Sequence, residues 1–139
     1  MPEEITNKEA IATESQTEAQ IESQTEEMYQ QMQEYLKMTE LLPLEEFNAY
    51  YRKAMDFLQL NYQALSQDQQ LKMKAICAIV SQNSAGRAHL DKMNRKKFQK
   101  IEEKSKFWTN AIELRLKKEG LSQEDIETRE KLLFKDSQE

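Results

Sequence analysis

The sequence predicts an all-α helical bundle of about four main helices, with one overlong helix (about 84–119) and no β-sheet. The 139-residue chain contains only two glycines and two prolines. Because these residues supply most tight turns, few sharp reversals are expected. Apolar residues also recur at helical spacings of three and four throughout 28–116. No segment of useful length alternates with the period of two that is typical of a strand.

The N-terminal residues 1–25 are predicted to form a polar, mobile segment outside the bundle, either disordered or a frayed helical extension. Their large apolar side chains are Ile5, Ile11 and Ile21, which are too few to offset the entropy of ordering the chain. The segment is also acidic, because residues 1–51 carry twelve acids and two bases. We expect the bundle to span residues 26–121.

The first helix is predicted from about Thr25 to Leu41, because Met28, Met32 and Leu36 fall on one face. Pro43 ends it, since the residue before a proline is pushed away from helical dihedral angles.

The second helix is predicted from Pro43 to Leu65, since proline suits the first turn of a helix. Glu45 and Glu46 then complement the helix dipole.

The third helix is predicted to begin at Ser66, where Ser66 and Gln69 fit a capping box, and to end near Gln82. Residues 83–86 (Asn-Ser-Ala-Gly) resemble an internal break. With no further break before Glu119, the fourth helix becomes the overlong one, and part of it is expected to overhang the bundle.

The C-terminal region is predicted to hold one short further helix, 122–139. Gly120 occupies the position of a helix-ending glycine, and Leu121 can supply the accompanying hydrophobic contact. Ser122 then begins a new helix with acidic residues in its first turn.

The residue types argue against catalysis, so we expect no enzyme activity, cofactor, metal ion or small-molecule substrate. The one histidine, His89, has no partner at the right helical spacing, and Cys77 lies in an apolar run where it is expected to be a core residue. No metal-binding cluster or phosphate-binding glycine loop occurs. No signal peptide or membrane span is apparent, so a cytoplasmic protein that binds no membrane is expected.

The predicted function is a non-enzymatic interaction module, an adaptor or regulator that contacts another protein or a second copy of itself. An overlong amphipathic helix and seven methionines indicate packing that a partner completes. Aromatic residues dominate interface energetics. The candidate interface residues are therefore Tyr50, Tyr51, Phe98, Phe107 and Trp108.

The alternative is a nucleic-acid-binding regulator, because residues 87–118 carry eleven bases and four acids. A break at 83–86 followed by a basic helix has the outline of a helix-turn-helix. Against this, the chain has a net charge of −5, and Glu102 and Glu103 interrupt the basic residues. The candidate contacts are Arg87, Lys92, Arg95, Lys96, Lys97, Lys100, Lys104 and Lys106.

Overall fold

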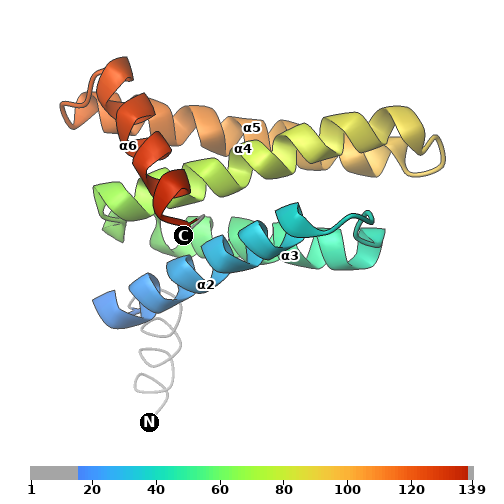
Figure 1. The fold of residues 1–139 in the computed structure, drawn as a ribbon, viewed down its shortest axis with the longest axis horizontal. Helices are drawn as coiled ribbons and strands as arrows, with labels where there is room; N and C mark the ends of the chain where they lie inside the picture. Colours follow the sequence, from blue (N-terminus) through green and yellow to red (C-terminus); the bar gives the residue numbers. More distant parts are fainter. Residues whose placement is uncertain (1–15, 138–139) are drawn as a thin grey trace, which may run out of the picture.

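The computed structural model describes residues 16–137, and side chains through residue 133. Within this part of the chain the fold is a bundle of five α-helices and one 3-10 turn without strands, which confirms the predicted all-α class (Figure 1). The elements are α2 (Glu18–Lys37), α3 (Leu44–Asn61), η1 (Tyr62–Ala64), α4 (Gln67–Leu90), α5 (Arg95–Lys118) and α6 (Gln123–Ser137). None of these helices is long and apolar enough to cross a membrane.

Helix α4 is the centre of the bundle and contacts α2, α3, α5 and α6. It forms an antiparallel hairpin with α5, which lies beside it along its length, while α2 and α3 run in opposite directions below them (Figure 1). The core position explains why Leu71, Ile76 and Cys77 of α4 are fully buried.

The short helix α6 crosses α4 near its N-terminal half (Figure 1). It buries Ile126, and Lys74 of α4 lies 3.1 Å from a carboxylate oxygen of Glu130. Arg129 also pairs with Asp68 at the start of α4. Both ion pairs therefore hold the predicted C-terminal helix against the central one.

Helix α2 begins earlier than the sequence analysis predicts, so the assignment of 1–25 to a mobile segment is wrong for its last residues. Thr17 and Gln20 form a capping box that starts the helix at Glu18. Ile21 and Thr25 are buried, so this turn belongs to the bundle. Residues 1–15 lie outside the described part of the chain.

The predicted break at 83–86 is also wrong, and with it the overlong helix 84–119. Helix α4 continues to Leu90, and the chain reverses at 91–94. Gly86 keeps a negative φ, while Ser84 is fully buried inside the helix. The reversal is formed instead by Asp91, whose carboxylate accepts hydrogen bonds from the Asn94 backbone N–H at 3.1 Å and side-chain amide at 2.9 Å.

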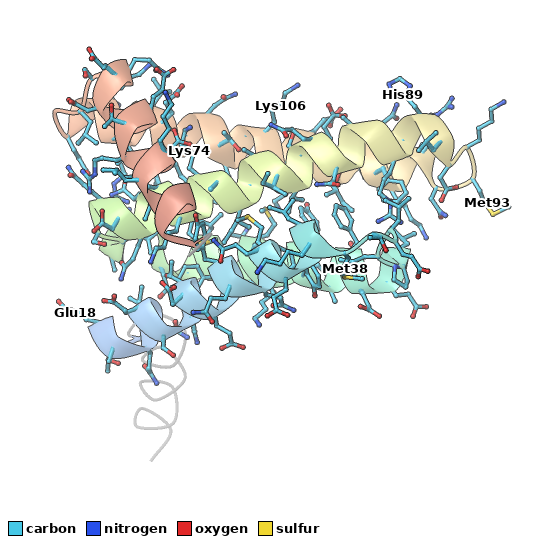
Figure 2. The ribbon with its side chains drawn as sticks, viewed as in Figure 1. Glu18, Met38, Lys74, His89, Met93 and Lys106 are labelled. Atoms are coloured by element: carbon cyan, nitrogen blue, oxygen red, sulfur yellow. The ribbon has the colours of Figure 1, made fainter. Side chains whose placement is uncertain are left out.

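Two exposed residues show how this error arose. Leu90 and Met93 fall at the spacing of an apolar stripe if 84–119 is read as one helix, but they lie at the hairpin tip, where Met93 points into solvent (Figure 2).

The helix-end signals at Ser66 and Gly120 are confirmed, whereas α2 ends at Lys37 rather than near Leu41, and α3 ends at Asn61 rather than at Leu65. Ser66 forms the predicted capping box with Gln69. Gly120 has a φ of +106°, the left-handed conformation that favours glycine. The N–H of Gly120 donates to Lys117 and that of Leu121 donates to Leu116, each at 3.1 Å. These two bonds define a Schellman motif at the end of α5.

Candidate functional site

Two of the five predicted interface residues are core residues, so the prediction that they anchor a partner is wrong in this fold. Phe98 is fully buried and its ring packs 6.0 Å from that of Phe47. Tyr50 is also buried. Its ring meets that of Tyr35 edge-on at 5.3 Å, and its hydroxyl donates to the carbonyl of Met28 at 2.7 Å. Burial raises the pKa of this hydroxyl above its ordinary value.

The other three aromatic residues differ in exposure. Tyr51 and Trp108 are half-buried, and the Trp108 ring packs 5.2 Å from that of Tyr62. Phe107 is 64% exposed and touches the edge of Trp108 at a centroid distance of 5.8 Å. The five residues therefore do not form one surface, and Phe107 is the most accessible of them.

Two of the predicted nucleic-acid contacts have structural roles. The guanidinium of Arg87 lies over the rings of Phe47 and Phe98, at 5.2 Å and 4.8 Å from their centroids, and burial lowers its pKa. Arg95 donates its Nε hydrogen to the Ala88 carbonyl at 2.9 Å, which links α5 to α4.

The remaining basic candidates are exposed, but not in the geometry of a helix-turn-helix. Helices α4 and α5 lie side by side rather than crossing steeply (Figure 1), and Asn94, a possible base-reading residue, is held by Asp91. Lys106 points away from the bundle (Figure 2) and pairs with Glu102 at 3.8 Å. The other exposed lysines are Lys92, Lys96, Lys97, Lys100 and Lys104.

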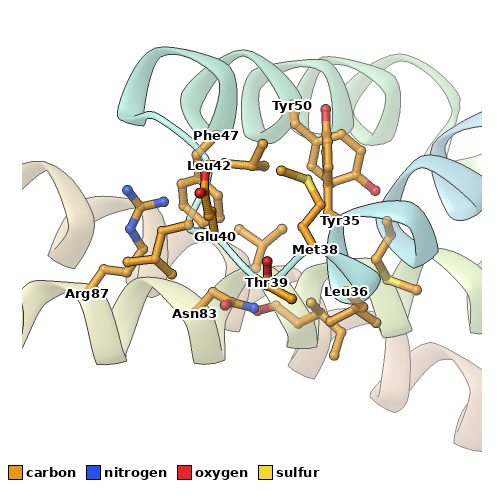
Figure 3. Close-up of a pocket in the computed structure, with 14 residues that line it drawn as sticks. Tyr35, Leu36, Met38, Thr39, Glu40, Leu42, Phe47, Tyr50, Asn83 and Arg87 are labelled. Carbon is orange, nitrogen blue, oxygen red and sulfur yellow. The ribbon is translucent and has the colours of Figure 1, made fainter.

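A groove that the sequence analysis missed lies between the α2–α3 connection and α4 (Figure 3). Its volume is about 180 Å³. Helix α2 ends at Lys37 and α3 begins at Leu44, and residues 38–42 of the connection between them line the groove. The main apolar lining residues are Met32, Tyr35, Leu36, Met38, Leu41, Leu42, Phe47, Tyr50, Ile79 and Val80.

The rim of this groove combines apolar side chains with a few polar ones. Leu36 and Met38 are about half exposed, and Leu41 is 65% exposed. Asn83 lines the α4 side and donates its amide to the Ile79 carbonyl at 2.9 Å. Arg87 stands at one end (Figure 3), and no carboxylate within residues 16–133 lies at ion-pair distance from it. The exposed Glu40 of the connection also lines the groove, which therefore offers an apolar surface with one guanidinium and one carboxylate at its rim.

The described residues contain no group of three or more His, Cys, Asp or Glu side chains placed to hold a metal ion. Cys77 is buried, and burial raises the pKa of its thiol to about 12. A thiol in that state is a poor nucleophile. His89 is exposed on α4 (Figure 2).

Comparisons with known proteins give no further information on function. No protein-family model, curated protein or solved structure matches this chain.

Proposed function

We propose that this protein is a non-enzymatic interaction module that binds a partner protein through the groove between the α2–α3 connection and α4. The observation that supports the proposal most is the group of exposed apolar side chains at the groove rim, Leu36, Met38 and Leu41. They lie within six residues of one another, beside a floor that includes Ile79. Clustered apolar surface of this kind is typical of interaction sites.

The size of the groove sets the expected mode of binding. A cavity of about 150 Å³ lined by apolar side chains accommodates a benzene molecule. The groove, at about 180 Å³, therefore has room for one phenyl or branched aliphatic side chain. Burying such a side chain contributes about 1.5–3 kcal/mol. A partner that inserts one apolar residue would gain about this much, and covering the exposed apolar side chains of the rim would add to it.

The experiment is photo-crosslinking in cells of the native host, with a benzophenone amino acid in place of Leu41. The proposal predicts a discrete crosslinked protein, identified by mass spectrometry. Adding Met38→Glu and Ile79→Glu should abolish the crosslink, because both charges would stand in the groove. Met93→Glu is the matched control, because Met93 is 93% exposed and lies at the hairpin tip.

The outcomes are distinct. A crosslink that persists in the groove variant would refute the assignment to the groove, and the absence of any crosslink would refute the interaction itself. Circular dichroism of each variant verifies that the helices are retained.

Nucleic-acid binding through α5 is the weaker proposal. Arg87 and Arg95, the arginines among its candidate contacts, are engaged with rings and a carbonyl. The exposed candidates are lysines, which bind phosphate as flexible point charges and lack the rigid planar fork of arginine.

A further inference from the structure

Exposed basic and apolar side chains recur at a regular spacing along the outward face of α5, the side of the helix turned away from the bundle. Lys96, Lys100, Phe107, Leu114 and Lys118 follow one another at spacings of four, seven, seven and four. Such spacings return to the same side of a helix. All five side chains are exposed, whereas the buried residues of α5, among them Phe98 and Ile112, lie on the opposite side.

The centre of this outward face is apolar. Phe107 is 64% exposed and Leu114 is 62% exposed. They stand one heptad apart, about 10 Å along the helix axis. Neither contributes to the core of the described fold. The two side chains therefore form an apolar pair that faces solvent.

The ends of the outward face are basic and have no ion-pair partner among the described side chains. Lys96 and Lys100 precede the apolar pair, and Lys118 follows it. Within residues 16–133 no carboxylate lies at ion-pair distance from these three ammonium groups. On the edges of the face, Lys104 adds a further base and Glu103 a single acid.

The acidic helix of this chain does not neutralise α5. Helix α5 carries nine bases and three acids, whereas α2 carries five acids and one base. Helix α4 contacts both of them, and α2 packs on α4 rather than on α5 (Figure 1). The basic charge of α5 thus remains directed outward.

We propose that the outward face of α5 binds an acidic amphipathic helix of a partner protein. Two apolar side chains of the partner would cover Phe107 and Leu114, and carboxylates near both its ends would face Lys96, Lys100 and Lys118. The face extends for about 33 Å from residue 96 to residue 118, so the partner helix needs about 22 residues. This is a second surface, separate from the groove, with its own partner chemistry.

The pattern argues against a symmetric dimer through α5. A parallel pairing would place each lysine beside the same lysine of the other copy, so like charges would oppose it. An antiparallel pairing that stacks Phe107 on Leu114 would bring Lys100 within one helical turn of Lys118 of the other copy, and the single Glu103 opposite Lys118 offsets only part of this repulsion.

The apolar pair also favours a protein over a nucleic acid. Phosphates would engage the lysines but would leave Phe107 and Leu114 exposed at the centre of the contact. An amphipathic helix satisfies both kinds of side chain.

The test measures fluorescence anisotropy of a 22-residue helical peptide with leucines at heptad spacing and glutamates flanking them. The controls are a peptide of the same composition in scrambled order and a 20-base-pair DNA duplex. Titrations of the full chain are made at 50 and 200 mM NaCl. We expect the patterned peptide to bind at least tenfold more tightly than the scrambled one.

Variants assign the contact. Phe107→Ser with Leu114→Ser should weaken binding at least tenfold, and Lys100→Glu with Lys118→Glu should weaken it most at low salt. The matched control is Leu90→Ser with Met93→Ser, which removes two exposed apolar side chains at the hairpin tip and should leave binding unchanged.

Several results would overturn the proposal. One is equal affinity for the two peptides; another is no peptide binding at all. Tighter binding of DNA than of the patterned peptide, lost in the lysine variant and retained in the Phe107/Leu114 variant, would assign the face to polyanions instead. The groove variant Met38→Glu with Ile79→Glu should not affect peptide binding, so failure at either surface is recognised separately.

Discussion

The two glycines of this chain provide a direct test of where its helices end. Gly86 lies in the interior of α4, has a negative φ, and a Cβ built on it meets nothing within 4 Å. Alanine is favoured over glycine by about 1 kcal/mol in a helix interior. Gly86→Ala should therefore raise the free energy of unfolding by about 1 kcal/mol. For a domain of this size that corresponds to about 3–4 °C in Tm.

Gly120 is the matched counterpart. A Cβ there also meets nothing within 4 Å, but the residue has a φ of +106°. Because the left-handed conformation costs an L-residue about 1–2 kcal/mol, Gly120→Ala should lower the free energy of unfolding by about that amount. Both substitutions add the same methyl group in open space. Opposite signs of their effects on the free energy of unfolding would therefore result from the different backbone conformations of the two glycines.

The assay is urea unfolding monitored by helical circular dichroism and by Trp108 fluorescence, with the slope of the transition fitted for each variant. A Gly86→Ala variant that is less stable than the parent would refute the continuous helix α4 and restore a break at 83–86. The double variant should show additive changes, because the residues lie in different elements. An unchanged slope shows that the variants unfold from equally compact states.

Three further predictions concern single side chains. Burial and a thiol pKa of about 12 predict that Cys77 reacts with Ellman's reagent at least 100-fold more slowly in native protein than in urea; equal rates would show that the thiol is accessible. Glu130→Ala should lower the free energy of unfolding by about 1–3 kcal/mol, because it removes the nearer carboxylate partner of the largely buried Lys74 and leaves only Glu113, at 3.9 Å, whereas Lys74→Met should cost less. Hydrogen bonds from Asn94 hold the pKa of Asp91 below its ordinary value. The ionised Asp91 therefore stabilises the fold fully above the ordinary pKa, and this contribution is lost as the pH falls through the pKa of Asp91 in the folded protein. The stability difference between the parent and Asp91→Ala should accordingly shrink below about pH 4; a difference unchanged at lower pH would exclude the carboxylate as its cause.

The sequence predicts this fold best where the signal is local. The capping box at Ser66 and the glycine stop at Gly120 depend on bonds between residues three to five positions apart, and both are found. The prediction of a break at 83–86 is wrong because a glycine is compatible with both a turn and a helix, and packing on α5 favours the helix. The chain turns instead from Asp91 to Asn94. Aspartate and asparagine both favour turns, but so does glycine, so the residue types alone did not favour a turn at Asp91 over one at Gly86.

The candidate site was less predictable for a physical reason. Aromatic residues are easily recognised in a sequence, but whether each side chain faces the core or the solvent depends on residues distant in the chain. Tyr50 faces α2 because its hydroxyl reaches the carbonyl of Met28, and Phe98 meets Phe47 of α3. The groove exists because residues 38–42 approach Ile79 and Val80, a contact that helical periodicity does not encode.

The position of α4 has a consequence for how the chain assembles. Helix α4 packs most extensively on α5, which follows it directly in the sequence. The α4–α5 hairpin can therefore form through local contacts before α2, α3 and α6 pack on it. Amide protons in the middle of α4 are then expected to exchange with deuterium last, as the final part of the native state to open.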